Sequence, residues 1–319
     1  MSLKQEVFLT IHDQDDKLVV DTTGLRVDFD VRHIDGFSRA TFKIWNLNDE
    51  TIKNVLTGER YVTVTTKLHG RNEFLVANKY FVSNGYDETK LPNNIVTLFC
   101  YDKLHKDLFD VELPDGGVTI QAPCTLKRIV AGIFASVGYT IAPTYLFFPD
   151  DLEALASPAG YATFDGSVDD AMAELAQEFE FKTYMEDGKV VLMYLPDLDN
   201  VDRTGISEAE VVTLRTDMMQ SNPSIGPAIL NVTSNLDSRL RPGKVLDVSQ
   251  LLTISAGADE QAAQLADGYF KTGLAGFSRY QVLAVQHKGS NYTSEWFSNV
   301  TASAPTKGDV ASTINWLNQ

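Results

Sequence analysis

The residues of this sequence that could carry metal or acid–base chemistry lie far apart along the chain. Two histidines that bind one metal ion from a helix stand about four residues apart, so that both rings project from the same face. No two of the five histidines have this spacing. They are His12, His33, His69, His105 and His287. We therefore predict a structural or surface role for each histidine and no metal site.

Carboxylates gather in two loops of the sequence. The first loop contains Asp150, Asp151 and Glu153, and the second contains Asp197, Asp199 and Asp202. Glycoside hydrolysis needs two carboxylates across a cleft, whereas a calcium loop needs oxygen ligands and a glycine at fixed positions. The calcium pattern fails, because Val201 and Asp202 occupy an oxygen-ligand position and the glycine position. We interpret both loops as solvated; a catalytic pair in the first and a loose cation site in the second are the alternatives.

The motif Gly-Phe-Ser-Arg occurs twice, at residues 36–39 and 276–279. A nucleophile elbow requires Gly-x-Ser-x-Gly between a strand and a helix. Here the fifth residue is Ala40 or Tyr280, and both serines precede strand patterns. The pair Gly116-Gly117 is not followed by Lys-Ser or Lys-Thr, so a phosphate-binding loop is excluded. The sequence gives no catalytic, cofactor-binding or metal-ligating candidate, and we predict that the chain is not an enzyme.

The composition indicates a globular protein with a strong acidic excess. Apolar residues make up 44% of the 319 residues and charged residues 22%, and this length suggests two or three domains. The 27 lysines and arginines against 43 aspartates and glutamates give a net charge of −16. Such a surface repels phosphate, which argues against sequence-specific DNA binding. Solubility alone explains an acidic surface, but an acidic wall would also suit a passage through which DNA moves without sticking.

The cysteines and the apolar stretches of the sequence indicate the cellular compartment in which we expect the protein. Cys100 and Cys124 do not form a Cys-x-x-Cys motif, which excludes zinc ribbons and dithiol redox motifs. We expect two buried thiols in a reducing compartment rather than a disulfide. The N-terminus has no apolar stretch of signal-peptide length, and no run approaches the roughly 20 apolar residues of a membrane span. We therefore expect synthesis in the cytoplasm and no membrane contact.

Alternating apolar residues predict strands over most of residues 1–112. In residues 25–31, every second side chain is apolar, which puts one face of the strand in a core and the other in water. Asn48 is a good cap and starts one short helix. This pattern favours a small barrel or sandwich. Trp45 and Trp296 fall in strand patterns, and we expect both to be core or interface anchors.

The pattern of residues 113–200 changes and predicts an α/β unit. Apolar residues follow helical spacing from Thr125 until Gly138 ends the helix. A second helix begins at the cap Ser167, and a hairpin follows with its turn at Gly188.

Strands return in residues 201–305, interrupted by a helix predicted at about residues 259–272, and residues 306–319 form a peripheral tail. A strand, polar turn and strand starting at Tyr280 echo the same arrangement starting at Tyr80. Both look like the terminal hairpins of two separate β-domains. The repeat signal is weak, so a true duplication stays open.

Three stretches of the sequence carry distinctive motifs, at residues 42–52, 240–243 and 280–290. These motifs resemble those of phage baseplate hub proteins. Residues 42–52, Phe-Lys-Ile-Trp-Asn-Leu-Asn-Asp-Glu-Thr-Ile, look like the passage from strand to helix in the first domain of that family. Residues 280–290, Tyr-Gln-Val-Leu-Ala-Val-Gln-His-Lys-Gly-Ser, followed by Glu295-Trp296, resemble its closing hairpin. Leu240-Arg241-Pro242-Gly243 is similar to its turn before a late strand. Each motif is moderately specific, and their order extends the resemblance over most of the chain.

The resemblance implies a mixed β and α+β fold. Two tube-type antiparallel β-barrel or sandwich domains, at residues 1–112 and 201–305, would flank the α/β domain at 113–200. Three chains would form a homotrimeric ring that matches a six-fold tail tube protein on one side and a three-fold spike protein on the other. The α/β domain would contact other baseplate proteins. Genomic DNA would pass through the ring transiently, repelled by acidic lumen residues and without specific binding, in the tail baseplate of a virion.

Other functions remain open at this point. The chain could be the hub or spike component of a contractile secretion system or a phage-derived bacteriocin, which neighbouring genes would distinguish, or another tail component such as a tube subunit. A tail-associated peptidoglycan hydrolase would release peptidoglycan fragments. A carbohydrate-binding receptor module would show aromatic clusters on one β-face.

Overall fold

One large β-sheet dominates the fold. The computed structural model describes residues 5–34, 36–68, 71–74, 79–90, 93–121, 124–146, 148, 161–186, 188–194, 211–221, 223–225, 229–251 and 279–303. The strands of the large sheet are β1 (Gln5–His12), β2 (Leu18–Asp21), β3 (Val27–Ile34), β4 (Phe37–Trp45), β5 (Tyr61–Leu68), β6 (Arg71–Phe74), β7 (Tyr80–Lys90), β8 (Asn93–Asp102), β14 (Val211–Thr213), β15 (Ser224–Ile225), β16 (Ile229–Asn235), β17 (Val245–Asp247), β18 (Arg279–Ser290) and β19 (Trp296–Ser303).

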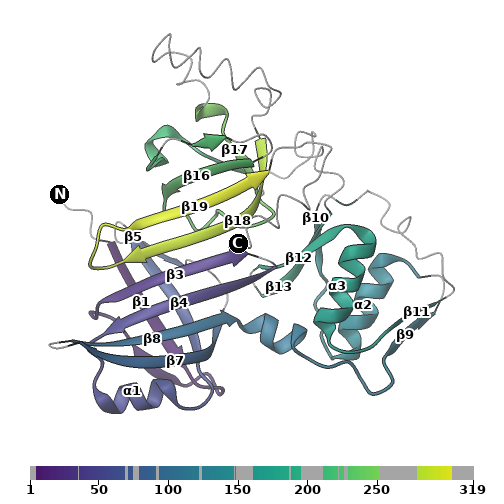
Figure 1. Cartoon of the computed structure of the whole chain (residues 1–319), viewed down its shortest axis with the longest axis horizontal. Helices are drawn as coiled ribbons and strands as arrows, with labels where there is room; N and C mark the ends of the chain where they lie inside the picture. Colours follow the sequence, from purple (N-terminus) through teal and green to yellow (C-terminus); the bar gives the residue numbers. More distant parts are fainter. Residues whose placement is uncertain are drawn as a thin grey trace, which may run out of the picture.

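The order of the strands brings the two ends of the chain together. The hydrogen-bonded path is β15-β16-β19-β18-β3-β4-β8-β7-β5-β1-β2, with β6 beside β5, β17 beside β18 and β14 beside β17. Strand β18, from the last part of the described chain, therefore lies directly against β3, from the first part (Figure 1).

Local sequence explains why these elements form. Val27 and Phe29 on β3 are buried, whereas the residues that alternate with them are more exposed, as the predicted period of two requires. Helix α1 (Asp49–Leu56) begins where the side chain of Asn48 accepts a hydrogen bond from the backbone N–H of Thr51 at 2.8 Å. This contact confirms the predicted helix start.

A smaller unit of helices and short strands lies to one side of the large sheet (Figure 1). Its elements are the short helix η1 (His105–Phe109), β9 (Val118–Gln121), α2 (Leu126–Ser136), β10 (Thr144–Leu146), β11 (Tyr161–Phe164), α3 (Val168–Phe179), β12 (Phe181–Glu186) and β13 (Lys189–Tyr194). Strands β12 and β13 form the predicted hairpin, and β10 runs parallel to β13. Both predicted helices are present; α3 starts with a capping box between Ser167 and Asp170.

Buried apolar residues form three main clusters. The first lies among strands β1–β5, β7 and β8 and helix α1, the second in the smaller unit, and the third among β14 and β16–β19. The first cluster also includes Trp296 of β19, which is 3% exposed. The predicted domain boundaries at residues 112, 200 and 305 stay predictions, since the large sheet runs without a break through strands from the first and third of these segments.

Other sequence predictions have mixed outcomes. Cys100 and Cys124 are both buried free thiols, as predicted. Within the described ranges, no helix is long and apolar enough to span a membrane. The predicted helix at 259–272 and the tail at 306–319 lie outside the described residues, as do the acidic loops.

Candidate functional site at the seam between β3 and β18

The pairing of β3 with β18, which we call the seam, joins two parts of the chain that are far apart in sequence. The strands are antiparallel, and the register runs from Val285 opposite His33 to Ser290 opposite Asp28. Strand β18 also pairs with β19, and β3 with β4, so the seam lies inside the sheet rather than at an edge. Because backbone pairing fixes register and limits twist, the seam sets how the two β-regions lie relative to each other.

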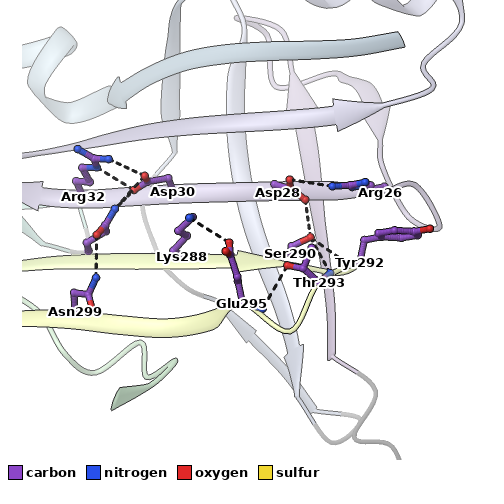
Figure 2. Close-up of polar contacts among 11 residues, drawn as sticks. Arg26, Asp28, Asp30, Arg32, Lys288, Ser290, Tyr292, Thr293, Glu295 and Asn299 are labelled. Carbon is purple, nitrogen blue, oxygen red and sulfur yellow. Dashed lines mark hydrogen bonds and ion pairs between the residues drawn. The ribbon is translucent and has the colours of Figure 1, made fainter. Parts of the chain in front are cut away.

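A row of polar side chains, which we call the polar ladder, crosses the seam on the face of the sheet opposite the core. Thr233 on β16 donates to Asn299 on β19 at 2.9 Å, and Asn299 donates to Gln286 on β18 at 3.1 Å. Gln286 donates to both carboxylate oxygens of Asp30 on β3, at 2.9 and 3.0 Å. Arg32 holds the same carboxylate with two hydrogen bonds (Figure 2). The polar ladder thus links four adjacent strands.

Asp30 is the charged centre of the polar ladder. Burial is the largest single effect and raises the pKa of Asp30, but hydrogen bonds from Arg32 and Gln286 act against it and leave the pKa below its ordinary value. The carboxylate is therefore ionised at neutral pH. Hydrogen bonds to an ionised acceptor are stronger than those between neutral groups, so Asp30 strengthens the contact between β3 and β18.

Two ion pairs lie beside the polar ladder, both toward the Ser290 end of the seam (Figure 2). Lys288 lies 3.2 Å from Glu295, and Arg26 lies 3.6 Å from Asp28. All four side chains are partly exposed, so each pair contributes little to stability. Ser290 adds a shorter contact across the seam, because its hydroxyl donates to Asp28 at 2.6 Å.

Asn291, just after β18, extends the seam with its side chain. Its Oδ1 accepts from the backbone N–H of Val27 at 2.9 Å, and its Nδ2 donates to the carbonyl oxygen of Leu25 at 2.6 Å. Its own backbone N–H donates to the carbonyl of Val27 at 3.2 Å. One asparagine therefore satisfies several backbone groups where the chain enters β3.

On the core face, the seam is closed by aromatic packing against a glycine. A Cβ atom at Gly289 would lie 2.6 Å from the Cε1 and Cζ atoms of Phe29, a distance that real Cβ contacts essentially never show. Phe29 also packs edge-on against Trp296, with ring centroids 5.9 Å apart, and the Trp296 indole donates to the carbonyl of Ser290 at 2.5 Å. Glycine at this position leaves room for the buried ring of Phe29.

Arg26 adds a cation–π contact at the end of the seam. Its guanidinium lies 4.0 Å from the ring centroid of Trp45 and 4.6 Å from that of Tyr292. Trp45 and Trp296 are 8% and 3% exposed, which confirms the prediction that both tryptophans are core or interface anchors.

The structure brings together few of the residues that could carry chemistry. Two pairs are exceptions: His33 and His287 face each other across the seam, and Nε2 of His105 lies 3.4 Å from Oδ1 of Asp110. Ser38 of the first Gly-Phe-Ser-Arg motif is buried and shares a hydrogen bond with the Tyr80 hydroxyl at 2.8 Å, so it is a core contact. Among the residues that the structure places, no group of three His, Cys, Asp or Glu could hold a metal ion. His69, the acidic loops and most of the second Gly-Phe-Ser-Arg motif fall outside those residues.

Two surface cavities lie on either side of His105. One, of about 360 Å³, is lined partly by α3 and includes Asp169; the other, of about 470 Å³, lies over β4 and β8 and includes Asp110. Each cavity lining contains a single carboxylate. A glycoside hydrolase needs two carboxylates facing one another, so neither cavity has that arrangement.

No family model and no curated protein matches this chain. Solved structures match over nearly its whole length. The tail protein from Neisseria meningitidis MC58 is 10% identical, with a TM-score of 0.56 over 93% of this chain and 96% of that one. The 43 kDa tail protein of prophage MuSo2 from Shewanella oneidensis is 9% identical, with a TM-score of 0.56 over 96% of this chain and 100% of that one. The chain has the fold of these tail proteins.

A further match links this tail-protein fold to a secretion machine. The E. coli c3393 protein is 10% identical, with a TM-score of 0.51 over 94% of this chain and 74% of that one. It is a component of the type VI secretion system with structural similarity to the T4 bacteriophage tail proteins gp27 and gp5. At these identities the similarity establishes the fold alone. The β-rich mixed fold expected from the resemblance to tail proteins is confirmed at that level.

Proposed function

We propose that this chain is a structural subunit of a phage-type tail, a baseplate hub protein that forms a ring between the tail tube and the spike. The fold that it shares with tail proteins supports the tail role. The seam is the observation that carries the ring, because it makes one continuous sheet from strands at both ends of the described chain.

A ring of three chains can match a six-fold tube only if each chain presents two β-regions at a fixed angle. A flexible linker between them would let that angle vary, and heterologous contacts close a ring only when the rotation is fixed. The seam removes this freedom through backbone pairing, the polar ladder and the contacts of Asn291. We infer a homotrimer whose remaining partners are a tail tube protein, a spike protein and, through the α/β unit, other baseplate proteins.

The charges on the polar face of the seam bear on the passage of DNA. Along the paired segments of β18, β3 and β4, this face carries a mixture of both signs. The charged residues are Asp28, Asp30, Arg32, Arg39, Lys43 and Lys288. The acidic excess of the chain is therefore not concentrated here. This face carries four basic side chains against two acidic ones, so if it lines the lumen it does not supply the repulsion by an acidic wall that the composition suggested.

The solution mass of the protein tests the ring. We expect a concentration-dependent trimer by analytical ultracentrifugation and three-fold rings by electron microscopy. Asn291→Ala loosens the seam and should reduce the trimer fraction, whereas Asn231→Ala, at an exposed position of β16, should leave it unchanged. A monomer at all concentrations, including in the presence of a tube or spike partner, would overturn the proposal.

A contractile secretion system is the second candidate machine, favoured by the match to the type VI component. The same ring would serve there, so the solution mass does not separate the two machines. The genes that flank this one do: capsid and tail genes indicate a phage, and an effector with a contractile sheath indicates a secretion system. A peptidoglycan-release assay tests the hydrolase alternative, for which the described cavities offer no carboxylate pair.

A further inference from the structure

Two buried imidazoles lie on the core face of the seam. His33 of β3 is 6% exposed, and His287 of β18 is fully buried. Their ring centroids are 5.6 Å apart and the ring planes meet at 81°. In the register, His33 is opposite Val285 and His287 is opposite Val31, so the two rings are diagonal neighbours across the seam.

The hydrogen bonds of His287 fit its neutral form. Nε2 lies 3.1 Å from the carbonyl oxygen of Leu240, which can only accept, so Nε2 carries the hydrogen. Nδ1 then accepts from the Ser298 hydroxyl at 2.9 Å. A proton on Nδ1 would make this nitrogen a donor, so the Ser298 hydroxyl, which also accepts from the backbone N–H of Asp237 at 3.1 Å, would have to turn its hydrogen away from the ring.

His33 is held less completely. Its Nε2 is buried and has no hydrogen-bond partner among the residues that the structure describes. A neutral ring there forgoes one hydrogen bond, whereas an imidazolium would put an unpaired charge in the core, which costs far more. Protonation of one ring also disfavours protonation of its neighbour, because like charges repel at this distance.

The loop before β17 places a cation near both rings. Arg241 disfavours positive charge on His33 and on His287. Asp237 in the same loop favours positive charge on His287. The Asp237 carboxylate also pairs with Arg239 at 2.7 Å, and this positive charge weakens the attraction of Asp237 for a proton on the His287 ring.

The strands on the other side of the pair contribute few compensating charges. Tyr80 of β7 shares a hydrogen bond with Ser38 of β4, and burial raises its pKa, so it stays protonated and neutral. Asp102 of β8 lies near Tyr80 and acts on it electrostatically. Cys100 of β8 is also neutral, because burial raises the pKa of its thiol.

The two imidazoles take up protons less readily in the closed seam than in an opened chain. Burial, followed in its lowering effect by Arg241, brings the pKa of His287 to about 4 against the hydrogen bond to Leu240. Burial, then His287 and Arg241, lowers the pKa of His33 well below its ordinary value. An unfolded histidine titrates near ~6.5. The stability of the closed seam is therefore complete above about pH 6.5 and falls as the pH drops toward about 4.

We propose that the His33–His287 pair makes the seam an acid-sensitive joint, which is closed at neutral pH and opens on protonation before the rest of the large sheet unfolds. The proposal concerns a single chain and does not depend on the ring. Opening would free the two β-regions to move relative to each other, since β3–β18 is the strand pairing that connects them.

Hydrogen exchange of the full-length chain, corrected for the intrinsic effect of pH, tests the joint. The pKa of His287 is about 4 in the closed seam and ~6.5 in the opened chain. This difference predicts that protection of the β3 and β18 amides falls about 20-fold between pH 7 and pH 5, and His33 adds to this loss. Amides in β1 and β5 should keep their protection. The double variant His33→Phe, His287→Gln removes both titrating groups while glutamine can still donate to Leu240, and its seam should lose no more than two-fold. His12→Gln, at a half-buried histidine of β1, should behave as the wild type.

Three outcomes would overturn the joint: seam protection that is unchanged at pH 5, an equal loss in the double variant, or loss in β1 and β5 in step with β18. If the double variant does not fold, measurements on the wild-type protein alone test the proposal. The imidazole Cε1–H resonances of the wild type, followed by NMR, should show that both rings are neutral at pH 6. The rings should become protonated at the same pH at which the cross-peaks across the seam are lost. Imidazoles that titrate near their ordinary value without any change at the seam would also contradict the proposal.

Discussion

Replacing Asn291 with alanine probes the seam at one side chain. The change removes two hydrogen bonds: Oδ1 no longer accepts from the N–H of Val27, and Nδ2 no longer donates to the carbonyl of Leu25. A net hydrogen bond contributes about 0.5–1.5 kcal/mol, and a buried group left without a partner costs about 1–3 kcal/mol. Asn291 is half-buried, so water reaches part of the site. We therefore expect the free energy of unfolding to fall by about 2–3 kcal/mol.

Chemical denaturation followed by fluorescence measures this change, and hydrogen exchange locates it. Amides at the start of β3 and the end of β18 should lose protection first, because the lost bonds lie there. Asn231→Ala is the matched control: this exposed asparagine accepts one hydrogen bond, from Thr301 at 2.9 Å, and its loss should cost less than about 0.5 kcal/mol. Equal effects of the two substitutions would refute the reasoning that Asn291 holds the seam.

Two of the remaining predictions concern other side chains of the seam, and the third concerns the start of α3. Gly289→Val should destabilise the protein by about 3 kcal/mol or more, because the new Cβ overlaps the buried ring of Phe29; a change below about 1 kcal/mol by denaturation would show that the core yields there. Asp30→Asn should destabilise the seam at pH 7. The difference in the free energy of unfolding between this variant and the wild type should shrink as the pH falls below about 4, because the pKa of Asp30 is lowered in the folded protein and its stabilising effect is lost on protonation. Denaturation at pH 7 and pH 3 measures this difference. Ser167→Ala removes the capping box of α3 and should cost about 1 kcal/mol, with exchange increased in the smaller unit and not at the seam.

Local structure could be predicted from the sequence because its causes are local. Alternation along residues 25–31 identified the buried face of β3, and the caps at Asn48 and Ser167 marked two helix starts. Glycine at 188 likewise marked the hairpin of β12 and β13. Each of these signals depends on residues a few positions apart, which a sequence displays directly.

The neighbours across the seam could not be predicted in the same way. Period two determines which face of a strand is buried, but it does not determine which strand lies beside it. The echo between the hairpins starting at Tyr80 and Tyr280 gave no indication that β18 pairs with β3. Asn291 gave no signal, since its partners Leu25 and Val27 are more than two hundred residues away and an Asn in a turn is ordinary.

The position of the seam in the sequence has a consequence for folding. The first apolar cluster includes Trp296, and the entry to β3 depends on Asn291, so the first β-region has its full set of contacts only after residues 279–303 have been synthesised. Until then β3 lacks its neighbour and presents an unpaired edge, which is a site for pairing with another chain. The polar residues Asp28, Asp30 and Arg32 on that strand limit such pairing, because charged side chains on an exposed edge disfavour it. The residues that link β3 to β18 in the closed seam would thus also protect β3 from pairing with another chain before β18 has been synthesised.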